Sequence, residues 1–183
     1  MKKIIYIHGY NSSGSTGKSM QEIFSKYFPG CEVIAPKISP YFEEAREQIS
    51  EILKNDDIDL VIGTSLGGFM TLKIDNPKIS KIVINPVFDP YVDLARIDAP
   101  KEVYETYIDD SIFVRTPSHS NLIGIFGDKD ALVNYRDYFK MFFSNAGIKT
   151  FPEMEHQIKP EEIENILVEV IKEYLKFFKK ILF

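Results

Sequence analysis

Short apolar runs alternate along the chain with longer segments in which apolar residues recur at helical spacing. The apolar runs occupy residues 3–7, 32–35, 60–62, 81–84 and 122–126, with a weaker sixth run at 149–151. The helical segments lie at about 18–28, 41–54, 66–75 and 134–145. Several runs are apolar on both faces, as expected for strands covered by helices on each side. The alternation predicts the α/β class: a mostly parallel sheet of about six strands with helices on both faces.

Right-handed crossovers then restrict the order of the strands. If the strand at 60–62 is central, the order across the sheet is 2-1-3-4-5-6 in chain numbering. A last helix should begin at Pro160, a residue tolerated in a first turn, and carry an apolar face from Ile163 to Phe178. Acidic side chains share its polar face with lysines, which favours packing on the sheet over binding to a membrane surface.

One connection is much longer than a crossover needs. Residues 86–120 contain four prolines together with several tyrosines and acids. Long connections inside a compact domain often form lids or binding loops. We therefore expect a small cap-like insertion at about 86–120 within a single domain that spans 1–183. Its aromatic residues Phe88 and Tyr91 are candidates for the wall of a substrate pocket, and a plain packed excursion at the sheet edge is the alternative.

Amino-acid composition and charge exclude several classes of protein. The chain has 183 residues, 44% of them hydrophobic, which suits one domain with a sizeable core. The net charge is -5, and nothing in this balance of charges indicates a basic surface, so nucleic acid is not an expected partner. A single cysteine, Cys31, excludes an internal disulfide, and we expect no metal and no cofactor. Because no apolar stretch approaches a membrane span and no signal peptide is recognisable, a cytoplasmic protein without membrane insertion is expected.

The strongest chemical signal is the segment Gly63-Thr64-Ser65-Leu66-Gly67. It follows the strand at 60–62 and opens a helical pattern, which is the context of a nucleophile elbow. Such a turn holds the serine in a strained conformation, and the two glycines remove side chains that would collide with the neighbouring strand and helix. The N–H of Leu66, at the helix N-terminus, is then a candidate donor to a developing oxyanion.

A serine needs a base and an orienting acid to act as a nucleophile. His156, in the loop before the last helix, comes last in the chain order Ser…Asp…His. His8 lies in a strand-end turn and is interpreted as structural, and His119 lies within the insertion. For the acid, Asp130 is preferred over Asp128, which we expect to bond its own turn. Both follow the strand at 122–126, and Asp89 is a weaker third candidate.

The second oxyanion donor should come from the loop after the first strand. There Gly9 permits a sharp bend, and the N–H of Tyr10 is the candidate. Taken together, these motifs make the sequence similar to the small α/β-hydrolases of the YqiA type, bacterial esterases with a short chain. The segments that carry the resemblance are 8–13, 63–68, Asn85-Pro86, the Asp130 loop with Tyr135-Arg136, and His156.

The resemblance implies a reduced α/β-hydrolase fold, the catalytic residues Ser65, Asp130 and His156, and hydrolysis of acyl esters. The expected partner is a small acyl ester or thioester, cleaved through an acyl-enzyme on Ser65. Two other functions compete with this one. Residues 14–19 resemble a phosphate-binding P-loop, but Ser12 stands where its first glycine belongs, so Ser15 or Thr16 capping a helix is the simpler interpretation. The other alternative is a non-catalytic binding module with a hydrolase-like fold.

Overall fold

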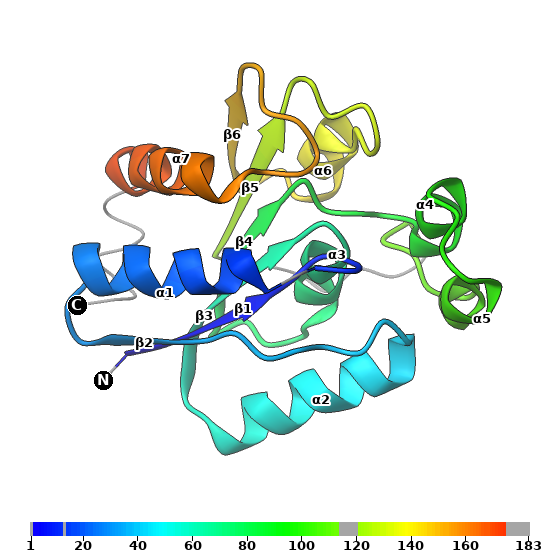
Figure 1. Cartoon of the computed structure of the whole chain (residues 1–183), viewed down its shortest axis with the longest axis horizontal. Helices are drawn as coiled ribbons and strands as arrows, with labels where there is room; N and C mark the ends of the chain where they lie inside the picture. The colour runs from blue at the N-terminus through cyan, green and yellow to red at the C-terminus, as the bar shows by residue number, and fades with distance from the viewer. Residues whose placement is uncertain (1, 13, 114–120, 175–183) are drawn as a thin grey trace.

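The computed structural model describes residues 2–12, 14–113 and 121–174, and a six-stranded sheet forms its centre (Figure 1). All neighbouring strands run parallel. The strands are β1 (Lys2–Ile7), β2 (Cys31–Ile34), β3 (Ile58–Thr64), β4 (Ser80–Ile84), β5 (Leu122–Gly127) and β6 (Gly147–Phe151). Their order is β2-β1-β3-β4-β5-β6, so both the predicted class and the predicted strand order are confirmed.

Helices cover both faces of this sheet. They are α1 (Ser15–Tyr27), α2 (Phe42–Asn55), α3 (Leu66–Lys73), α6 (Arg136–Phe142) and α7 (Pro160–Glu173). In Figure 1, α1 and α7 lie along one face, and α2 and α3 lie along the other. The core is divided in the same way, because α1 and α7 bury their apolar residues in one cluster, and α2, α3 and α6 bury theirs in a second.

Successive side chains of the first strand contribute alternately to the two hydrophobic clusters. In β1, Ile4 and Tyr6 belong to the cluster under α1 and α7, whereas Ile5 and Ile7 belong to the opposite one. All four are almost completely buried. Since successive side chains of a strand point to opposite faces, a strand covered on both sides must be apolar at every position.

Some helix limits differ from the prediction. Helix α1 begins at Ser15, earlier than expected, and Gly14 occupies the N-cap position with a left-handed φ of 82° and no side-chain cap. Capping by Ser15 or Thr16 was therefore wrong: both residues lie in the first turn, because Gly14 turns the chain directly into the helix. Helix α6 is shorter than predicted, since Tyr135 and Phe143 on either side of it have non-helical backbone angles.

The long connection between β4 and β5 folds into short helices beyond the carboxyl ends of the strands (Figure 1). These are α4 (Pro90–Arg96), α5 (Lys101–Tyr104) and the 3₁₀ helix η1 (Glu105–Tyr107). The buried Tyr107 donates a hydrogen bond to the carbonyl of Pro40 at 2.9 Å, and the hydroxyl of Thr106 accepts one from the N–H of Phe42 at 3.1 Å. The connection is thus anchored at the start of α2. Residues 114–120, with His119, lie outside the described residues.

Helix α7 packs on the sheet as predicted. Ile163, Leu167 and Val170 are completely buried, and Lys26 of α1 forms an ion pair with Glu164 at 2.7 Å. The rest of the expected helix, from residue 175 on, falls outside the described residues. Within the described ranges, no helix has both the length and the apolar character needed to cross a bilayer.

Candidate active site

Ser65 occupies a strained turn between β3 and α3. Its backbone angles, φ 53° and ψ -117°, lie outside the regions that non-glycine residues normally adopt. Hydrogen bonds on both sides of the residue hold it there. Its N–H donates to the carbonyl of Ile84 at 3.0 Å, and its carbonyl accepts from the N–H groups of Phe69 and Val87, each at 3.1 Å. Backbone strain of this kind persists only where the surroundings over-determine the conformation, and it is common at functional sites.

The two glycines of the motif permit this turn, as the sequence predicts. A Cβ atom on Gly63 would lie 2.2 Å from the carbonyl oxygen of Gly67, and one on Gly67 would lie 2.1 Å from that of Ile7. Gly9 provides a third close approach, because a Cβ there would lie 3.1 Å from the Cβ of Ser65. Helix α3, β3 and the loop after β1 therefore meet around Ser65 with almost no space between their backbones.

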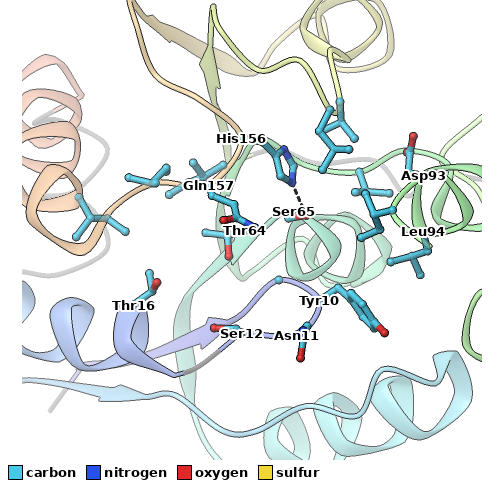
Figure 2. Close-up of a pocket in the computed structure, with 18 of the residues that line it drawn as sticks. Tyr10, Asn11, Ser12, Thr16, Thr64, Ser65, Asp93, Leu94, His156 and Gln157 are labelled. Carbon is cyan, nitrogen blue, oxygen red and sulfur yellow. Dashed lines mark hydrogen bonds between the residues drawn. The ribbon is translucent and has the colours of Figure 1, made fainter. Parts of the chain in front are cut away.

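The three predicted triad side chains form one hydrogen-bonded series. Ser65 Oγ lies 2.8 Å from His156 Nε2, as the dashed line in Figure 2 marks. His156 Nδ1 lies 2.8 Å from Asp130 Oδ2, and the other carboxylate oxygen of Asp130 accepts from the N–H groups of Leu132 and Val133 at 3.0 and 2.8 Å. An ionised carboxylate can only accept, so the proton belongs on Nδ1 and leaves Nε2 free to accept from the serine hydroxyl. The catalytic role of the three residues stays a prediction.

The other acids and His8 serve different contacts. The expectation that Asp128 bonds its own turn was wrong: its carboxylate accepts a hydrogen bond from the N–H of Glu153, in the histidine loop, at 2.7 Å. Asp89 caps α4. In His8, Nδ1 lies 2.7 Å from the carbonyl of Gly9, and Nε2 accepts from the N–H of Ile38 at 3.0 Å. These bonds join the loop after β1 to the chain beyond β2, which is a structural role.

The loop that carries His156 is fixed to the ends of β4 and β5 by a residue to which sequence reasoning gave no role. Asn85, 2% exposed, donates through Nδ2 to the carbonyls of Glu155 at 2.9 Å and His156 at 3.3 Å. Its Oδ1 accepts from the N–H of Gly127 at 2.8 Å. One buried amide thereby joins three segments and holds the main chain at the histidine. Its signals in the sequence are a polar residue directly after the apolar run Ile82–Ile84 and the Asn85-Pro86 pair of the family resemblance.

The two predicted oxyanion donors come from the residue after Ser65 and from the loop after β1, whose Gly9 approaches Ser65 closely. Leu66 is the first residue of α3, where an N–H has no acceptor within the helix. Tyr10 follows Gly9, whose carbonyl oxygen lies 2.7 Å from His8 Nδ1. Because the C=O and N–H of a trans peptide point in opposite directions, the N–H of Tyr10 points away from the His8 ring. Among the described residues, neither N–H donates to a protein acceptor. Both groups stay predicted donors.

Ser65 and His156 open onto a cavity of about 350 Å³. Figure 2 shows them between Tyr10, Asp93 and Leu94 on one side and Ser12, Thr16 and Gln157 on the other. The apolar residues in its wall are Ile84, Val87, Leu94, Ile97, Leu132, Val133, Ile158 and Ile163. From the connection between β4 and β5, the residues that line the cavity are Val87, Asp93, Leu94 and Ile97.

The two pocket residues predicted from the sequence were the wrong members of that connection. Phe88 is completely buried and stacks on the ring of Tyr135 with 5.0 Å between centroids. Tyr91 packs edge-on against Tyr104, 5.5 Å between centroids. Neither side chain belongs to the cavity wall. Phe88 packs in the hydrophobic core, and Tyr91 packs against α5.

Asp93 is an ionisable group in the cavity wall that the sequence did not single out. Its side chain is 3% exposed, and burial raises its pKa to about 6. Tyr135 opposes this by donating its hydroxyl to the two carboxylate oxygens at 3.1 and 2.9 Å, and Arg96 lies 3.4 Å away. In the sequence it is one of several acids in the long connection.

The phosphate-binding alternative does not match the local geometry. Residues 15–19 form the first turns of α1, and Gly17 is buried, with a Cβ position 2.9 Å from that of Ala35. The segment is a packed helical turn instead of a loop of the P-loop kind. In the described ranges, no group of three His, Cys, Asp or Glu side chains gathers closely enough to hold a metal ion.

Comparison with known families identifies the chain's relatives. Residues 3–118 match the model of the uncharacterised protein family UPF0227. The chain belongs to UPF0227. This is the YqiA-like family that the sequence resembles, so the predicted family is confirmed.

Solved structures similar to this UPF0227 member are α/β-hydrolases and esterases. Mouse alpha/beta hydrolase domain-containing protein 10 is 18% identical, with a TM-score of 0.75, over 95% of this chain and 89% of that one. Est1E from Butyrivibrio proteoclasticus is 16% identical, with a TM-score of 0.74, over 96% and 88%. MGS-MChE2, an alpha/beta hydrolase from the metagenome of sediments of the Mar Chica lagoon, Morocco, is 19% identical, with a TM-score of 0.68, over 94% and 91%. These likenesses establish the α/β-hydrolase fold.

The raised pKa of Asp93 predicts a pH-dependent stability difference. The folded state binds the proton more tightly than the unfolded chain, so this group stabilises the fold below pH 4 and that contribution is lost as pH rises through about 6. Asp93→Asn cannot titrate. Its free energy of unfolding relative to the natural chain should therefore increase by about 2 kcal/mol between pH 4.5 and 7.5. Urea denaturation at both pH values measures this, and a constant difference would contradict it.

Proposed function

We propose that this protein is a serine hydrolase that cleaves carboxylic esters or thioesters through an acyl-enzyme on Ser65. The observation that carries the proposal is the hydrogen-bonded series from Ser65 through His156 to Asp130 at the wall of a cavity. A strained serine at a helix N-terminus, a histidine with the correct tautomer and a buried acid together are the requirements for nucleophilic acyl transfer.

The geometry supports the following sequence of steps. Ser65 Oγ attacks the acyl carbonyl while its proton passes to His156 Nε2, 2.8 Å away. The N–H groups of Tyr10 and Leu66 stabilise the oxyanion. The bond to the leaving alcohol or thiol then breaks, and His156 gives it the proton. Water attacks the acyl-enzyme with His156 as base, the carboxylic acid departs, and Ser65 recovers its proton. Asp130 stabilises the imidazolium in both halves.

We further propose one domain over 1–183 with the connection at about 86–120 as a cap over the nucleophile. This proposal is supported by Val87, Leu94 and Ile97 of the connection, which border the cavity. A cavity of about 350 Å³ is near the lower end for small-molecule sites, which favours short to medium acyl chains over long ones.

Covalent labelling tests the nucleophile directly. A fluorophosphonate probe should add once to the natural chain, at Ser65, and Ser65→Ala should prevent labelling and lower ester turnover by at least about a thousandfold. Intact-mass spectrometry and a p-nitrophenyl butyrate assay measure the two effects. Ser50→Ala on α2 is the matched control and should label normally. A folded protein that never labels would instead support the non-catalytic binding module.

The two neighbouring aspartates give a second test. Asp130→Asn should lower kcat by about 10⁴-fold, because an amide can present its N–H₂ group to Nδ1 and stabilise the wrong tautomer. Asp128→Asn keeps an acceptor for the N–H of Glu153, so its loss should be far smaller. Steady-state kinetics on both variants decides between them, and a larger loss at Asp128 would refute the assignment of the acid.

Asn85 should act as a positioning residue. Asn85→Asp removes the donors to the Glu155 and His156 carbonyls, so the histidine loop should shift and kcat should fall about 10- to 100-fold with little change in KM. The fluorophosphonate labelling rate should fall in parallel. Asn145→Asp, the same change at an exposed turn, is the control. Unchanged kcat in a folded Asn85→Asp protein would show that the amide does not position the histidine.

A further inference from the structure

The cavity is chemically different on the two sides of Ser65. On one side lie the hydroxyl and amide groups of Ser12, Thr16 and Gln157. On the other side, Asp93 and Leu94, both from α4, border the cavity (Figure 2). A substrate held at Ser65 therefore extends toward hydroxyl groups in one direction and toward a single carboxylate in the other.

That carboxylate dominates the charge of the cavity. Among the described residues that line it, Asp93 is the one carboxylate, and there is no lysine or arginine. Because charges act strongly across a poorly solvated wall, a buried carboxylate there attracts cations and repels anions. Arg96 offsets this only in part, since its guanidinium is 3.4 Å away and its side chain is 59% exposed and therefore screened by solvent.

A purely structural role does not account for the charge. Asp93 ties α4 to the start of α6 by accepting a hydrogen bond from Tyr135, which an amide oxygen could accept as well. Burying an ionised carboxyl costs stability that an amide would not. The carboxylate accepts hydrogen bonds from the Tyr135 hydroxyl, the main chain of Asp89 and the exposed guanidinium of Arg96, and a carboxylate with about four lone-pair sites has capacity for another donor.

We propose that Asp93 is a subsite for a positively charged group on the substrate. This inference rests on the proposed ester or thioester hydrolysis at Ser65 and names the class of substrate. The substrate carries an ammonium group, separated from the scissile carbonyl by a short apolar segment that lies along Leu94 and its apolar neighbours. The ammonium belongs either to the acyl part or to the alcohol part, and matched substrates distinguish the two.

Two pairs of esters test the proposal at fixed ionic strength. The first is p-nitrophenyl 6-aminohexanoate against p-nitrophenyl hexanoate, with the charge on the acyl part. The second is hexanoylcholine against 3,3-dimethylbutyl hexanoate, with the charge on the alcohol part. In one pair, kcat/KM of the natural protein should favour the cationic ester by at least about tenfold. Equal values within both pairs would overturn the inference.

Variants attribute the preference to Asp93. Asp93→Asn should reduce the cationic-to-neutral ratio of kcat/KM by at least about tenfold. Asp89→Asn, which removes an equal charge from the N-cap of the same helix, should change that ratio less than about twofold. Tyr135→Phe removes the hydrogen bond but keeps the carboxylate, so it should retain the preference. An unchanged ratio in Asp93→Asn, or its loss in Tyr135→Phe alone, would overturn the assignment.

The outcome also separates this inference from the proposed function. If the fluorophosphonate labels Ser65 and the neutral esters are hydrolysed without a cationic preference, the function stands and the subsite is refuted. If the folded protein neither labels nor hydrolyses any of the four esters, the proposed function fails, and the subsite fails with it.

Discussion

The close contact of α3 with the carboxyl ends of β1 and β3 is the constraint on which the rest of the site depends. Gly67 lies against the Ile7 carbonyl and Gly63 against α3, and the chain passes from strand to helix through the strained, positive-φ conformation of Ser65. That turn offers its N–H to the end of β4 and its carbonyl to Val87. One contact between backbones thus fixes the nucleophile and the direction in which the long connection leaves the sheet.

The ends of β4 and β5 provide the second half of the arrangement. Each of the two aspartates after β5 has a different partner: Asp130 divides its oxygens between its own turn and His156, whereas Asp128 bonds the main chain of the histidine loop. Asn85 bonds the same loop from β4. The imidazole is therefore located by groups that directly follow two central strands of the sheet.

Sequence patterns predicted the features that depend on local chemistry. Glycines at fixed spacing predicted the turn at Ser65, apolar runs predicted the sheet and its order, and strand ends predicted which side chains meet there. Orientation within the long connection was not predictable, because short helices without a repeating pattern do not reveal that Leu94 faces the cavity and Phe88 the core. The roles of Asn85 and Asp93 were also not predicted, since each is a single polar residue that bonds a segment some 40 or more positions away in the chain.

The hydrogen bonds that hold the histidine loop also determine which of its positions can be substituted. On the loop side they use main-chain atoms: the N–H of Glu153 and the carbonyls of Met154, Glu155 and His156. The side chains of Glu153 and Glu155 are exposed, and the ion pair of Glu153 with Lys129, 3.7 Å across, contributes little. Substitutions at Glu155 can therefore accumulate over evolution without displacing His156. Glu153 is more restricted, because its φ of 61° favours glycine, asparagine and aspartate and its N–H is needed by Asp128.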